Sequence, residues 1–289
     1  MIKSYENQIA VVTGAANGIG RALALGIAER GSNLLLADIH GDEVEEVAKL
    51  ARKMGRTAYS LQADVSLAAD CEKIFRTCME KYGRCDILVN NAGVSVGAGV
   101  ETIRERDMRW IYETNVYSHW FMMQQFIPQM KKQGTHAQIL NVCSIAGLIT
   151  LGSAPAYFSS KHAAVGLSEC VYKSLRATGA DIDLAIFCPG FVQTEMHLTD
   201  RHRPERYAID PEDPYYKSDA YLAFIEINRK ILAAGKPLQE TVDKVFESLK
   251  TRNFFILTDE AYDPLLAHQG EFQVKREQPI DPSLFAKKS

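Results

Sequence analysis

Short apolar runs alternate with longer segments of helical periodicity along this chain. The apolar runs are mostly continuous, which is typical of parallel strands that are buried on both faces. We expect strands over Ile9–Thr13, Asn33–Asp38, Thr57–Asp64, Asp86–Asn90, Gln138–Cys143, Asp183–Cys188 and Phe254–Leu257. We expect helices over Ile19–Arg30, Gly41–Met54, Leu67–Tyr82, Ile103–Lys132, Ala156–Thr178 and Leu238–Lys250. This alternation predicts an α/β fold, a Rossmann-type doubly wound parallel sheet in a single domain over residues 1–289.

Two segments do not fit this alternation of strands and helices. Residues 191–237 separate the last two strands by far more than a typical loop and are rich in tyrosine. A long insertion at the carboxyl end of a strand is where α/β folds place substrate lids, so we expect a lid. A helical oligomerisation or surface element is the alternative. Residues 259–289 form a C-terminal extension, which either crosses to a neighbouring subunit or is loosely ordered.

Composition narrows the classes of partner. The 289 residues are 46% hydrophobic, enough for one large core, and the net charge of −3 with no basic stripe argues against a nucleic-acid partner. No window approaches ~18 consecutive apolar residues, and the first residues lack the apolar region of a signal peptide. We therefore expect a cytoplasmic protein with no membrane span.

The six cysteines raise the question of a metal or redox site. Cys71, Cys78 and Cys85 recur every seven residues, but the chain has no C-x-x-C pair and no histidine cluster beside them. We expect buried thiols in a reducing compartment and no metal.

A glycine-rich turn follows the first strand, in the pattern G-x-x-x-G-x-G. Gly14 permits a tight turn, and Gly18 and Gly20 let the backbone approach a pyrophosphate and pack the helix on the sheet. Free N–H groups at the helix start, around Asn17 and Ile19, then face the phosphates. The position between a strand and an amphipathic helix predicts a dinucleotide site, although an isolated glycine turn would be weak evidence.

The second strand ends at Asp38, 24 residues after Gly14. A carboxylate there accepts hydrogen bonds from a ribose 2′-hydroxyl and repels a 2′-phosphate, so we expect NAD(H) as cofactor. Arg21 and His40 are the nearby cations that could favour NADP(H) instead. The alternative role for Asp38 is to cap the following helix. The third strand ends at Asp64-Val65, where a carboxylate can bond the adenine amino group, and the fourth at Asn90-Asn91-Ala92-Gly93, which by itself could be an ordinary turn.

Candidate acid–base chemistry lies at the start of the helix over Ala156–Thr178. Tyr157 and Lys161 are four residues apart and therefore share one helix face. A phenol is a poor base at neutral pH, and an adjacent ammonium makes it more acidic. Ser144 follows the fifth strand, 13 residues before Tyr157, and its hydroxyl could bind a substrate oxygen. Asn115 sits in the middle of a predicted helix, where asparagine is unfavourable unless it has a task or a packing role.

Together these motifs resemble the short-chain dehydrogenase/reductase family, from Gln8 to about Leu257. The matching residues are Thr13-Gly14-x-x-x-Gly18-x-Gly20, Asp64-Val65, Asn90-Asn91-Ala92-Gly93, Asn115, Ser144, Tyr157-x-x-x-Lys161 and Pro189-Gly190-Phe191-Val192-x-Thr194.

The resemblance implies a role for each of these motifs. It implies that Tyr157 is the acid/base, that Lys161 tunes it and holds the nicotinamide ribose, and that Ser144 orients the substrate oxygen. It implies that Asn115 holds a water in a proton relay past Lys161, and that Asn91 shapes the fold around the cofactor. Contacts with the nicotinamide are implied for Pro189, Gly190, Val192 and Thr194, and so is a dimer or tetramer formed through the two long helices.

The substrate is the least defined part of this expectation. We expect an alcohol/ketone pair on a bulky apolar molecule such as a hydroxysteroid, because the insertion is aromatic and no Arg or Lys is obviously aimed at a substrate anion. Residues expected near the site are Ile145, Leu148, Phe158, Phe191 and Met196. Sugars or polyols, keto-thioesters and aromatic diols are alternatives, and so is a non-catalytic NAD-sensing regulator.

Overall fold

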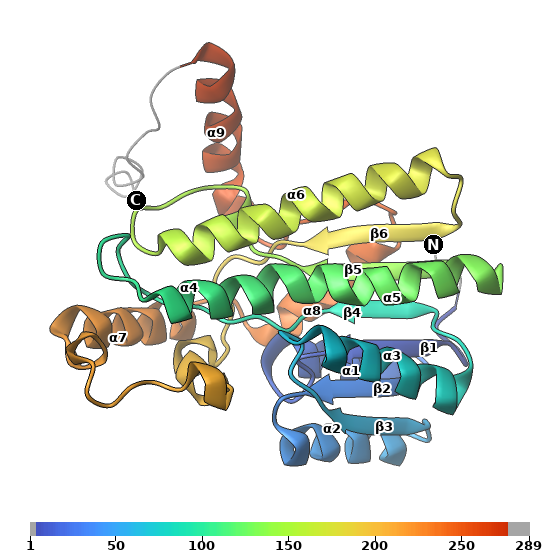
Figure 1. Ribbon diagram of the computed structural model, residues 1–289. Coiled ribbons are helices and arrows are strands. Elements are labelled where there is room, and N and C mark those ends of the chain that lie inside the picture. Colours follow the sequence, from blue (N-terminus) through green and yellow to red (C-terminus); the bar gives the residue numbers. More distant parts are fainter. Residues whose placement is uncertain (1–3, 277–289) are drawn as a thin grey trace.

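The computed structural model describes residues 4–276, and one parallel seven-stranded sheet forms its centre (Figure 1). The strand order is β3-β2-β1-β4-β5-β6-β7, which confirms the doubly wound α/β fold. The strands are β1 (Ile9–Thr13), β2 (Asn33–Asp38), β3 (Ala58–Gln62), β4 (Ile87–Asn90), β5 (Ala137–Val142), β6 (Ile182–Phe187) and β7 (Phe255–Ile256). All residues of β1, β4 and β5 are buried, as the continuous apolar runs predict.

Helices cover both faces of the sheet. One layer consists of α1 (Gly18–Glu29), α2 (Gly41–Lys53) and α8 (Leu238–Leu249), and its apolar residues form one core with β1 and β2. The other layer contains α3 (Ala68–Tyr82), α4 (Glu105–Tyr112), α5 (Ser118–Gln133) and α6 (Pro155–Ala177). Residues of α3, α5 and α6 form the second core with the opposite face of the strands.

The predicted helix over Ile103–Lys132 is wrong in one respect, because it is interrupted. A π-helical turn, η1 (Glu113–Tyr117), separates α4 from α5. Such turns widen the helix by one residue and occur often at functional sites. Asn115 lies at the middle of this turn, which is why a helix-disfavouring residue is tolerated there.

The insertion (residues 191–237) is mostly helical, not a plain loop. It contains three 3₁₀ helices, η3 (Met196–His202), η4 (Glu205–Tyr207) and η5 (Pro214–Lys217), followed by α7 (Asp219–Ala233). Its two ends meet, since Lys236 donates its amide to the carbonyl of Phe191 and accepts from the amide of Gln193. The insertion is therefore a self-contained unit that leaves and rejoins the domain at one place.

The C-terminal extension begins with a short 3₁₀ helix, η6 (Glu260–Tyr262), and continues as α9 (Asp263–Lys275). Figure 1 shows α9 projecting from the body of the domain. The part of the predicted extension beyond residue 276 lies outside the described residues. None of the helices in the described chain is long and apolar enough to cross a membrane.

Candidate active site

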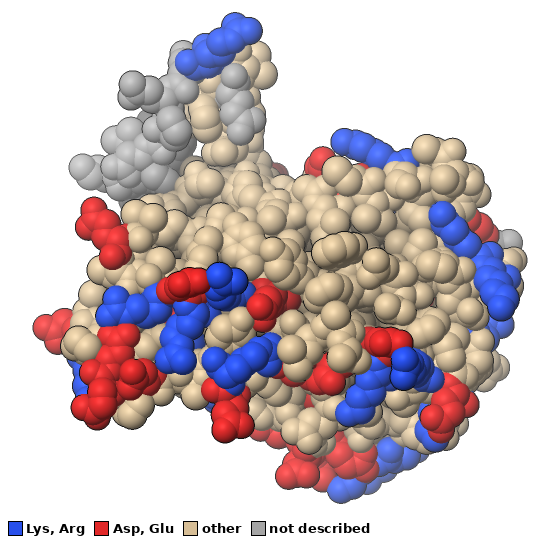
Figure 2. Space-filling model, in the orientation of Figure 1, with Lys and Arg blue, Asp and Glu red and all other residues tan. Residues whose placement is uncertain are grey.

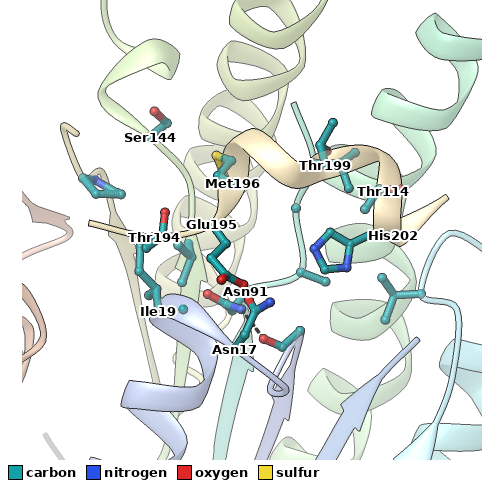
Figure 3. Close-up of a pocket in the computed structure, with 18 of the residues that line it drawn as sticks. Asn17, Ile19, Asn91, Thr114, Ser144, Thr194, Glu195, Met196, Thr199 and His202 are labelled. Atoms are coloured by element: carbon teal, nitrogen blue, oxygen red, sulfur yellow. Dashed lines mark hydrogen bonds between the residues drawn. The ribbon is translucent and has the colours of Figure 1, made fainter. Parts of the chain in front are cut away.

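A cavity lies at the carboxyl ends of the strands, where the order of the sheet reverses between β1 and β4 (Figure 3). Open α/β sheets bind ligands at this switch point. Every predicted site residue except Gly20 and Asn115 lines the cavity, namely Gly14, Asn17, Gly18, Ile19, Asp38, Asp64, Val65, Asn91, Ala92, Gly93, Ser144, Tyr157, Lys161, Pro189, Gly190, Val192 and Thr194. Residues from seven separate segments of the chain thus meet in one place.

The glycine-rich turn has the backbone that only glycine adopts easily. Gly14 and Gly18 have φ angles of 62° and 53°, in the left-handed region. A Cβ atom on Gly14 would lie 2.8 Å from the Cα of Ala92, and one on Gly20 would lie 2.0 Å from the carbonyl oxygen of Gly14. Gly20 therefore contributes by packing α1 against the turn, behind the cavity wall.

The start of α1 has the features of a phosphate site. Asn17 is the N-cap residue, yet its side chain makes no capping hydrogen bond, so the first amides of the helix keep their donors. The side-chain Nδ2 of Asn17 is buried, lines the cavity and has no partner among the described residues. A buried donor of this kind beside a helix N-terminus fits a dinucleotide pyrophosphate.

Asn91 connects the end of β4 to the glycine-rich turn. Its side-chain Nδ2 donates to the carbonyls of Thr13 (3.0 Å) and Gly14 (2.9 Å), and its own amide donates to the Thr13 hydroxyl. Both bonded carbonyls belong to the turn that would carry the cofactor. Asn91 therefore fixes the shape of the cavity floor, in keeping with the role that the resemblance implies.

Asp38 is buried and both of its carboxylate oxygens accept backbone hydrogen bonds. Oδ2 accepts from the amide of Ala16 (2.9 Å) and Oδ1 from the amide of His40 (3.0 Å). The N-cap of α2 is His40, so Asp38 does not cap that helix. Each oxygen keeps acceptor capacity beyond its backbone bond, because a carboxylate has about four acceptor sites, and Asp38 lines the cavity.

Asp64 also lines the cavity, but its carboxylate is shared with the insertion. Oδ2 accepts from Arg206 at 2.7 Å, and Oδ1 accepts from the amide and the hydroxyl of Ser66. An adenine amino group would therefore find Asp64 already ion-paired. The sequence could not indicate this pair, because the two residues are 142 positions apart.

Three polar groups converge at the deep end of the cavity. Ser144 follows β5, is buried, and accepts a hydrogen bond from the amide of Ala146 at its hydroxyl (3.1 Å). Tyr157 lies in the first turn of α6, and the Nζ of Lys161 is 5.9 Å from the centre of its ring. Nζ also donates to the carbonyl of Val142 at 3.3 Å. Lys161 is 2% exposed, so its charge acts within a desolvated site where it is felt strongly.

Asn115 holds the loop that follows β4 and does not line the cavity. Its Oδ1 accepts from the amide of Val94 (2.9 Å), and its Nδ2 donates to the carbonyl of Val94 (2.9 Å) and to the hydroxyl of Ser160 (3.0 Å). Both N–H groups and one acceptor site of the side-chain amide are thus used by protein groups. Its position explains the closeness of Gly93, where a Cβ atom would lie 3.4 Å from both the Oδ1 of Asn115 and the Nζ of Lys161.

The segment after β6 closes the cavity on the side of the C-terminal extension. Gly190 is covered by the ring of Tyr262, which an added Cβ atom would approach to 2.4 Å. Val192 forms a bridge with Lys236 at the base of the insertion. The side chain of Thr194 lies 3.6 Å from where a Gly18 Cβ atom would be, so it faces the glycine-rich turn.

The insertion also lines the cavity with residues on the helical segment that crosses the opening. Figure 3 shows Met196 there, as expected from sequence, together with Glu195, Thr199 and His202, which the sequence analysis missed. The Thr199 hydroxyl accepts from the amide of Ser95, and a ring nitrogen of His202 bonds one of His40 at 2.8 Å. Burial and the neighbouring His40 lower the pKa of His202, so this ring is neutral at pH 7.

The tyrosines of the insertion, expected beside the substrate, lie elsewhere. Tyr215, Tyr216 and Tyr221 pack edge to face on one another with ring centres 4.9–5.3 Å apart, and none of them lines the cavity. Tyr207 is also buried, in the cluster around Trp110. Their aromatic surface is used to build the core of the insertion itself.

A buried ion network fixes this core to α4. Arg203 is 3% exposed at its side chain and bonds Asp107 (2.6 Å) and Asp200 (2.7 Å). The hydroxyl of Tyr216 donates to Asp107 at 3.0 Å. The guanidinium also lies 4.5 Å from the ring of Trp110, which lines the cavity. The insertion is therefore anchored on the wall of the site.

The apolar residues expected near the substrate are mostly wrong. Of the five, Met196 lines the cavity, whereas Ile145, Leu148, Phe158 and Phe191 are absent from its wall in the described structure. Ile145 is buried and Phe191 is 40% exposed, so their side chains point into the protein or to solvent. Apolar lining comes instead from Val94, Trp110, Val142, Cys143 and Leu232.

The cysteines are free thiols. Cys71, Cys78 and Cys85 are buried in the core beside α3, and within residues 4–276 no group of His, Cys, Asp or Glu side chains is arranged to hold a metal. Cys170 is the exposed one.

Comparison with known proteins decides the family. Residues 8–205, more than half of the chain, match the family described as short chain dehydrogenase. The chain belongs to this family. Its members use nicotinamide cofactors, so this short chain dehydrogenase is an NAD(P)-dependent oxidoreductase.

Three relatives show how far the likeness extends. A crystal structure of a short chain dehydrogenase from Burkholderia phymatum in complex with NAD is 30% identical, with a TM-score of 0.92 over 97% of this chain and 99% of that one. A "CLA biosynthesis dehydrogenase/reductase" from Lactiplantibacillus plantarum is 38% identical over 275 residues, 95% of this chain and 94% of the relative. Estradiol 17-beta-dehydrogenase 11 from Rattus norvegicus is 34% identical over 193 residues, 66% of this chain and 64% of the relative.

Proposed function

We propose that this protein interconverts a secondary alcohol and a ketone on a bulky apolar molecule, with NAD(H) as the cofactor. The observation that carries the proposal is that Ser144, Tyr157 and Lys161 line the same cavity as the glycine-rich turn and Asp38. Two hydroxyls, a buried ammonium and a dinucleotide-binding site together suit the transfer of a hydride between the cofactor and the carbon of a C–OH group.

The roles of the protein groups follow from their positions. When bound, the nicotinamide supplies or accepts the hydride, and the chain provides orientation and charge. The hydroxyls of Ser144 and Tyr157 would bind the substrate oxygen, and Tyr157 would give it a proton in reduction and take one in oxidation. The ammonium of Lys161 stabilises the phenolate form of Tyr157 across the 5.9 Å that separates Nζ from the ring centre.

The preference for NAD(H) rests on Asp38. Its carboxylate is held by two backbone amides, so it stays in place whether or not a ribose is bound. A ring nitrogen of His40, two residues further on, is bonded to a ring nitrogen of His202. A fixed negative charge here favours a ribose with a free 2′-hydroxyl.

The cavity supports an apolar substrate. Of the described residues that line the cavity, Lys161 is the only Lys or Arg. Apolar surface comes from Val94, Trp110, Met196 and Leu232. Phosphorylated sugars carry their phosphate close to the reacting carbon and would need a cation there in addition to Lys161.

Two apolar substrate classes then remain, and the coverage of the relatives separates them. The steroid-linked relative matches 66% of this chain, whereas the CLA-linked relative matches 95%, which takes in the insertion that covers the cavity. Taking CLA as conjugated linoleic acid, this favours a long-chain hydroxy or oxo fatty acid over the hydroxysteroid expected from sequence. The insertion would act as the lid over its chain.

The test is a matched panel. Purified protein would be given NADH or NADPH with an oxo fatty acid, a ketosteroid, a small diketone and a keto-thioester, and cofactor absorbance would be followed. We expect turnover with NADH and highest kcat/KM for the oxo fatty acid. Faster reaction with NADPH would contradict the role of Asp38. NADH binding without turnover of any ketone would favour the alternative, a non-catalytic NAD-sensing regulator.

We also propose a homodimer or homotetramer built through α5 and α6. Tyr117, which immediately precedes α5, is 44% exposed, and Trp120 on α5 is 49% exposed and stacks on Phe121 with ring centres 5.5 Å apart. Figure 2 shows few charged side chains on the surface over these helices, compared with the surface below them. An apolar, aromatic face of this kind is typical of a subunit interface.

A further inference from the structure

His119 is a buried polar residue that the site described so far does not use. It lies in the first turn of α5, four residues after Asn115, and is 1% exposed. Neither of its ring nitrogens has a hydrogen-bond partner among the described residues. Leaving both nitrogens of an imidazole unbonded in a protein interior is costly, so such a residue calls for water or for a functional partner.

The surroundings of His119 lead to the catalytic lysine. One turn further along α5, the sulfur of Met123 contacts the Nδ2 of Asn141, which also donates to the hydroxyl of Ser168 on α6 at 2.9 Å. The residue after Asn141 is Val142, whose carbonyl accepts from the Nζ of Lys161. The buried face of α5 thus borders β5 beside the carbonyl that binds the Nζ of Lys161. One turn before His119, Asn115 lies close to the same ammonium, since a Cβ atom on Gly93 would be 3.4 Å from both the Oδ1 of Asn115 and the Nζ of Lys161.

The electrostatics agree with this position. Burial is the main reason why the pKa of His119 falls to about 3, and the charge of Lys161 lowers it further. Lys161 is the one charged group whose field acts on this ring, from α6; no acidic residue opposes it there. The ring is therefore neutral at pH 7, with one nitrogen that donates and one that accepts.

Lys161 has donors to spare on this side. An ammonium has three N–H groups, and in the described chain one of them has a protein acceptor, the carbonyl of Val142. A neighbouring water could accept from Lys161 and donate to the accepting nitrogen of His119. Such a water would have a fixed orientation, because the ring offers one acceptor only.

We propose that His119 is a positioning residue of the reaction, which holds the water through which Lys161 exchanges its proton. The inference rests on the proposed function, in which Tyr157 gains a proton when an alcohol is oxidised. The ammonium of Lys161 first gives one of its protons to the water, which passes a proton on towards solvent. The neutral amine then takes the proton from Tyr157, so that Lys161 is an ammonium again and Tyr157 a phenolate. His119 takes no net charge at any stage, since it accepts a hydrogen bond at one nitrogen and donates from the other.

The alternative is that His119 only fills space. Phe126, on the same helix, is 0% exposed and fills space without a polar side-chain atom. If packing were the whole requirement, an apolar ring of similar size should replace the imidazole without loss. The two interpretations therefore predict different results for phenylalanine at this position.

Two substitutions and one control separate them. His119→Phe keeps a ring but removes both nitrogens, His119→Gln keeps a donor and an acceptor, and Met122→Leu perturbs packing on the same helix. We expect His119→Phe to lower kcat about tenfold in alcohol oxidation and to increase the solvent deuterium isotope effect on kcat, with the Kd for NADH unchanged. His119→Gln should stay within about threefold of wild type, and Met122→Leu close to it.

Several outcomes would overturn the inference. A His119→Phe protein with wild-type kcat and isotope effect would show that the ring only packs. A His119→Gln protein as slow as His119→Phe would show that a hydrogen-bond donor and acceptor at this position do not support the reaction. If wild-type protein itself turns over no ketone or alcohol, the proposed function fails instead, which distinguishes the two failures.

A second readout does not depend on activity. A high-resolution crystal structure of the cofactor-free protein should contain a water within about 3.2 Å of a His119 ring nitrogen, on the side of Lys161. In His119→Gln this water should remain, and in His119→Phe it should be lost. A dry space beside the imidazole in the wild-type crystal would contradict the proposal.

Discussion

Arg206 of the insertion donates to the carboxylate of Asp64 at 2.7 Å, and Asp64 is a residue that also lines the cofactor cavity. The same guanidinium lies 3.6 Å from Glu113 at the π turn. One side chain thus links the insertion, the end of the third strand and the helix that carries Asn115. The insertion is tied to the adenosine side of the cavity as well as to its substrate side.

Removing this link should loosen the insertion without unfolding the protein. Arg206 and Asp64 are 34% and 16% exposed at their side chains, so the pair contributes less than about 1 kcal/mol to the free energy of unfolding. We expect Arg206→Gln to be cleaved faster within the insertion by a dilute protease and to raise the KM for the ketone severalfold. Arg229→Gln, which removes an exposed ion pair on α7, is the matched control and should change neither. Unaltered cleavage and KM in Arg206→Gln would show that the link does not hold the insertion closed.

The charge of Asp38 should set the choice between cofactors. Asp38→Asn keeps an acceptor for the amide of Ala16 or His40 but removes the negative charge that repels a 2′-phosphate. We expect the ratio of kcat/KM for NADH to that for NADPH to fall at least about tenfold, equivalent to about 1.4 kcal/mol. Asp42→Asn removes an exposed charge from the first turn of α2 and should leave the ratio unchanged. An Asp38→Asn protein with the wild-type ratio would remove the basis for NAD(H) preference.

Burial of His119 should make stability depend on pH. Its pKa is lowered to about 3 in the folded protein, whereas an unfolded histidine titrates near 6.5. Above pH 6.5 both states are neutral and the full stability is present; as the pH falls, the unfolded state binds a proton first and stability is lost. Between pH 7 and pH 5, protonation of this residue in the unfolded state should lower the free energy of unfolding by about 2 kcal/mol.

The measurement is a comparison of urea denaturation at the two pH values. Wild type should lose about 2 kcal/mol more between pH 7 and pH 5 than His119→Phe does, because the other histidines titrate in both proteins. Equal losses would mean that His119 is protonated in the folded state.

The aromatic face of α5 should hold the subunits together. Trp120→Glu places a charge where an apolar side chain is 49% exposed in the single chain. We expect this substitution to reduce the molar mass in light scattering to that of a smaller assembly or a monomer. Leu222→Glu on α7, where the side chain is 53% exposed, is the control and should keep the wild-type mass. A wild-type protein that is already monomeric would contradict the proposed assembly.

Much of the fold could be predicted because its strands are buried on both faces. Residues such as Val11, Leu35 and Ile139 are fully buried, and their apolar runs mark the strands without help from distant contacts. The predicted strand ends differ from the observed ones by one to two residues, as for β3, which occupies Ala58–Gln62 within the predicted Thr57–Asp64. The π turn could not be predicted, since the helical periodicity continues through it.

The structure of the insertion was harder to predict from sequence for a physical reason. Helix α7 keeps Leu222 and Ile227 more than half exposed, so its apolar pattern does not show which face is inside. Its tyrosines suggested a substrate wall. Where they pack is determined by contacts such as those of Tyr216 with Asp107, 109 positions earlier in the chain, and with Arg203, in a preceding turn of the insertion. The cavity residues Glu195, Thr199 and His202 depend on that packing, so sequence order alone gave no signal for them.

The proposed catalytic residues could be expected to converge from the sequence because they follow elements with strong patterns. Ser144 follows β5, and Tyr157 and Lys161 share the first turns of α6, so their convergence follows from the parallel sheet. Asn115 was correctly singled out as unusual in a helix. Its bonds to Val94 and Ser160, however, required the three-dimensional arrangement.

The most direct measurement of the central claim is the rate of NADH oxidation by wild type and Tyr157→Phe with the same oxo fatty acid. Phenylalanine removes the one proton that Tyr157 could give to the substrate oxygen and leaves the dinucleotide cradle intact. We expect kcat to fall by at least about 10²-fold, with the Kd for NADH within about twofold of wild type. A Tyr157→Phe protein that keeps wild-type kcat would contradict the assignment of Tyr157 as the acid/base, and with it the proposed function.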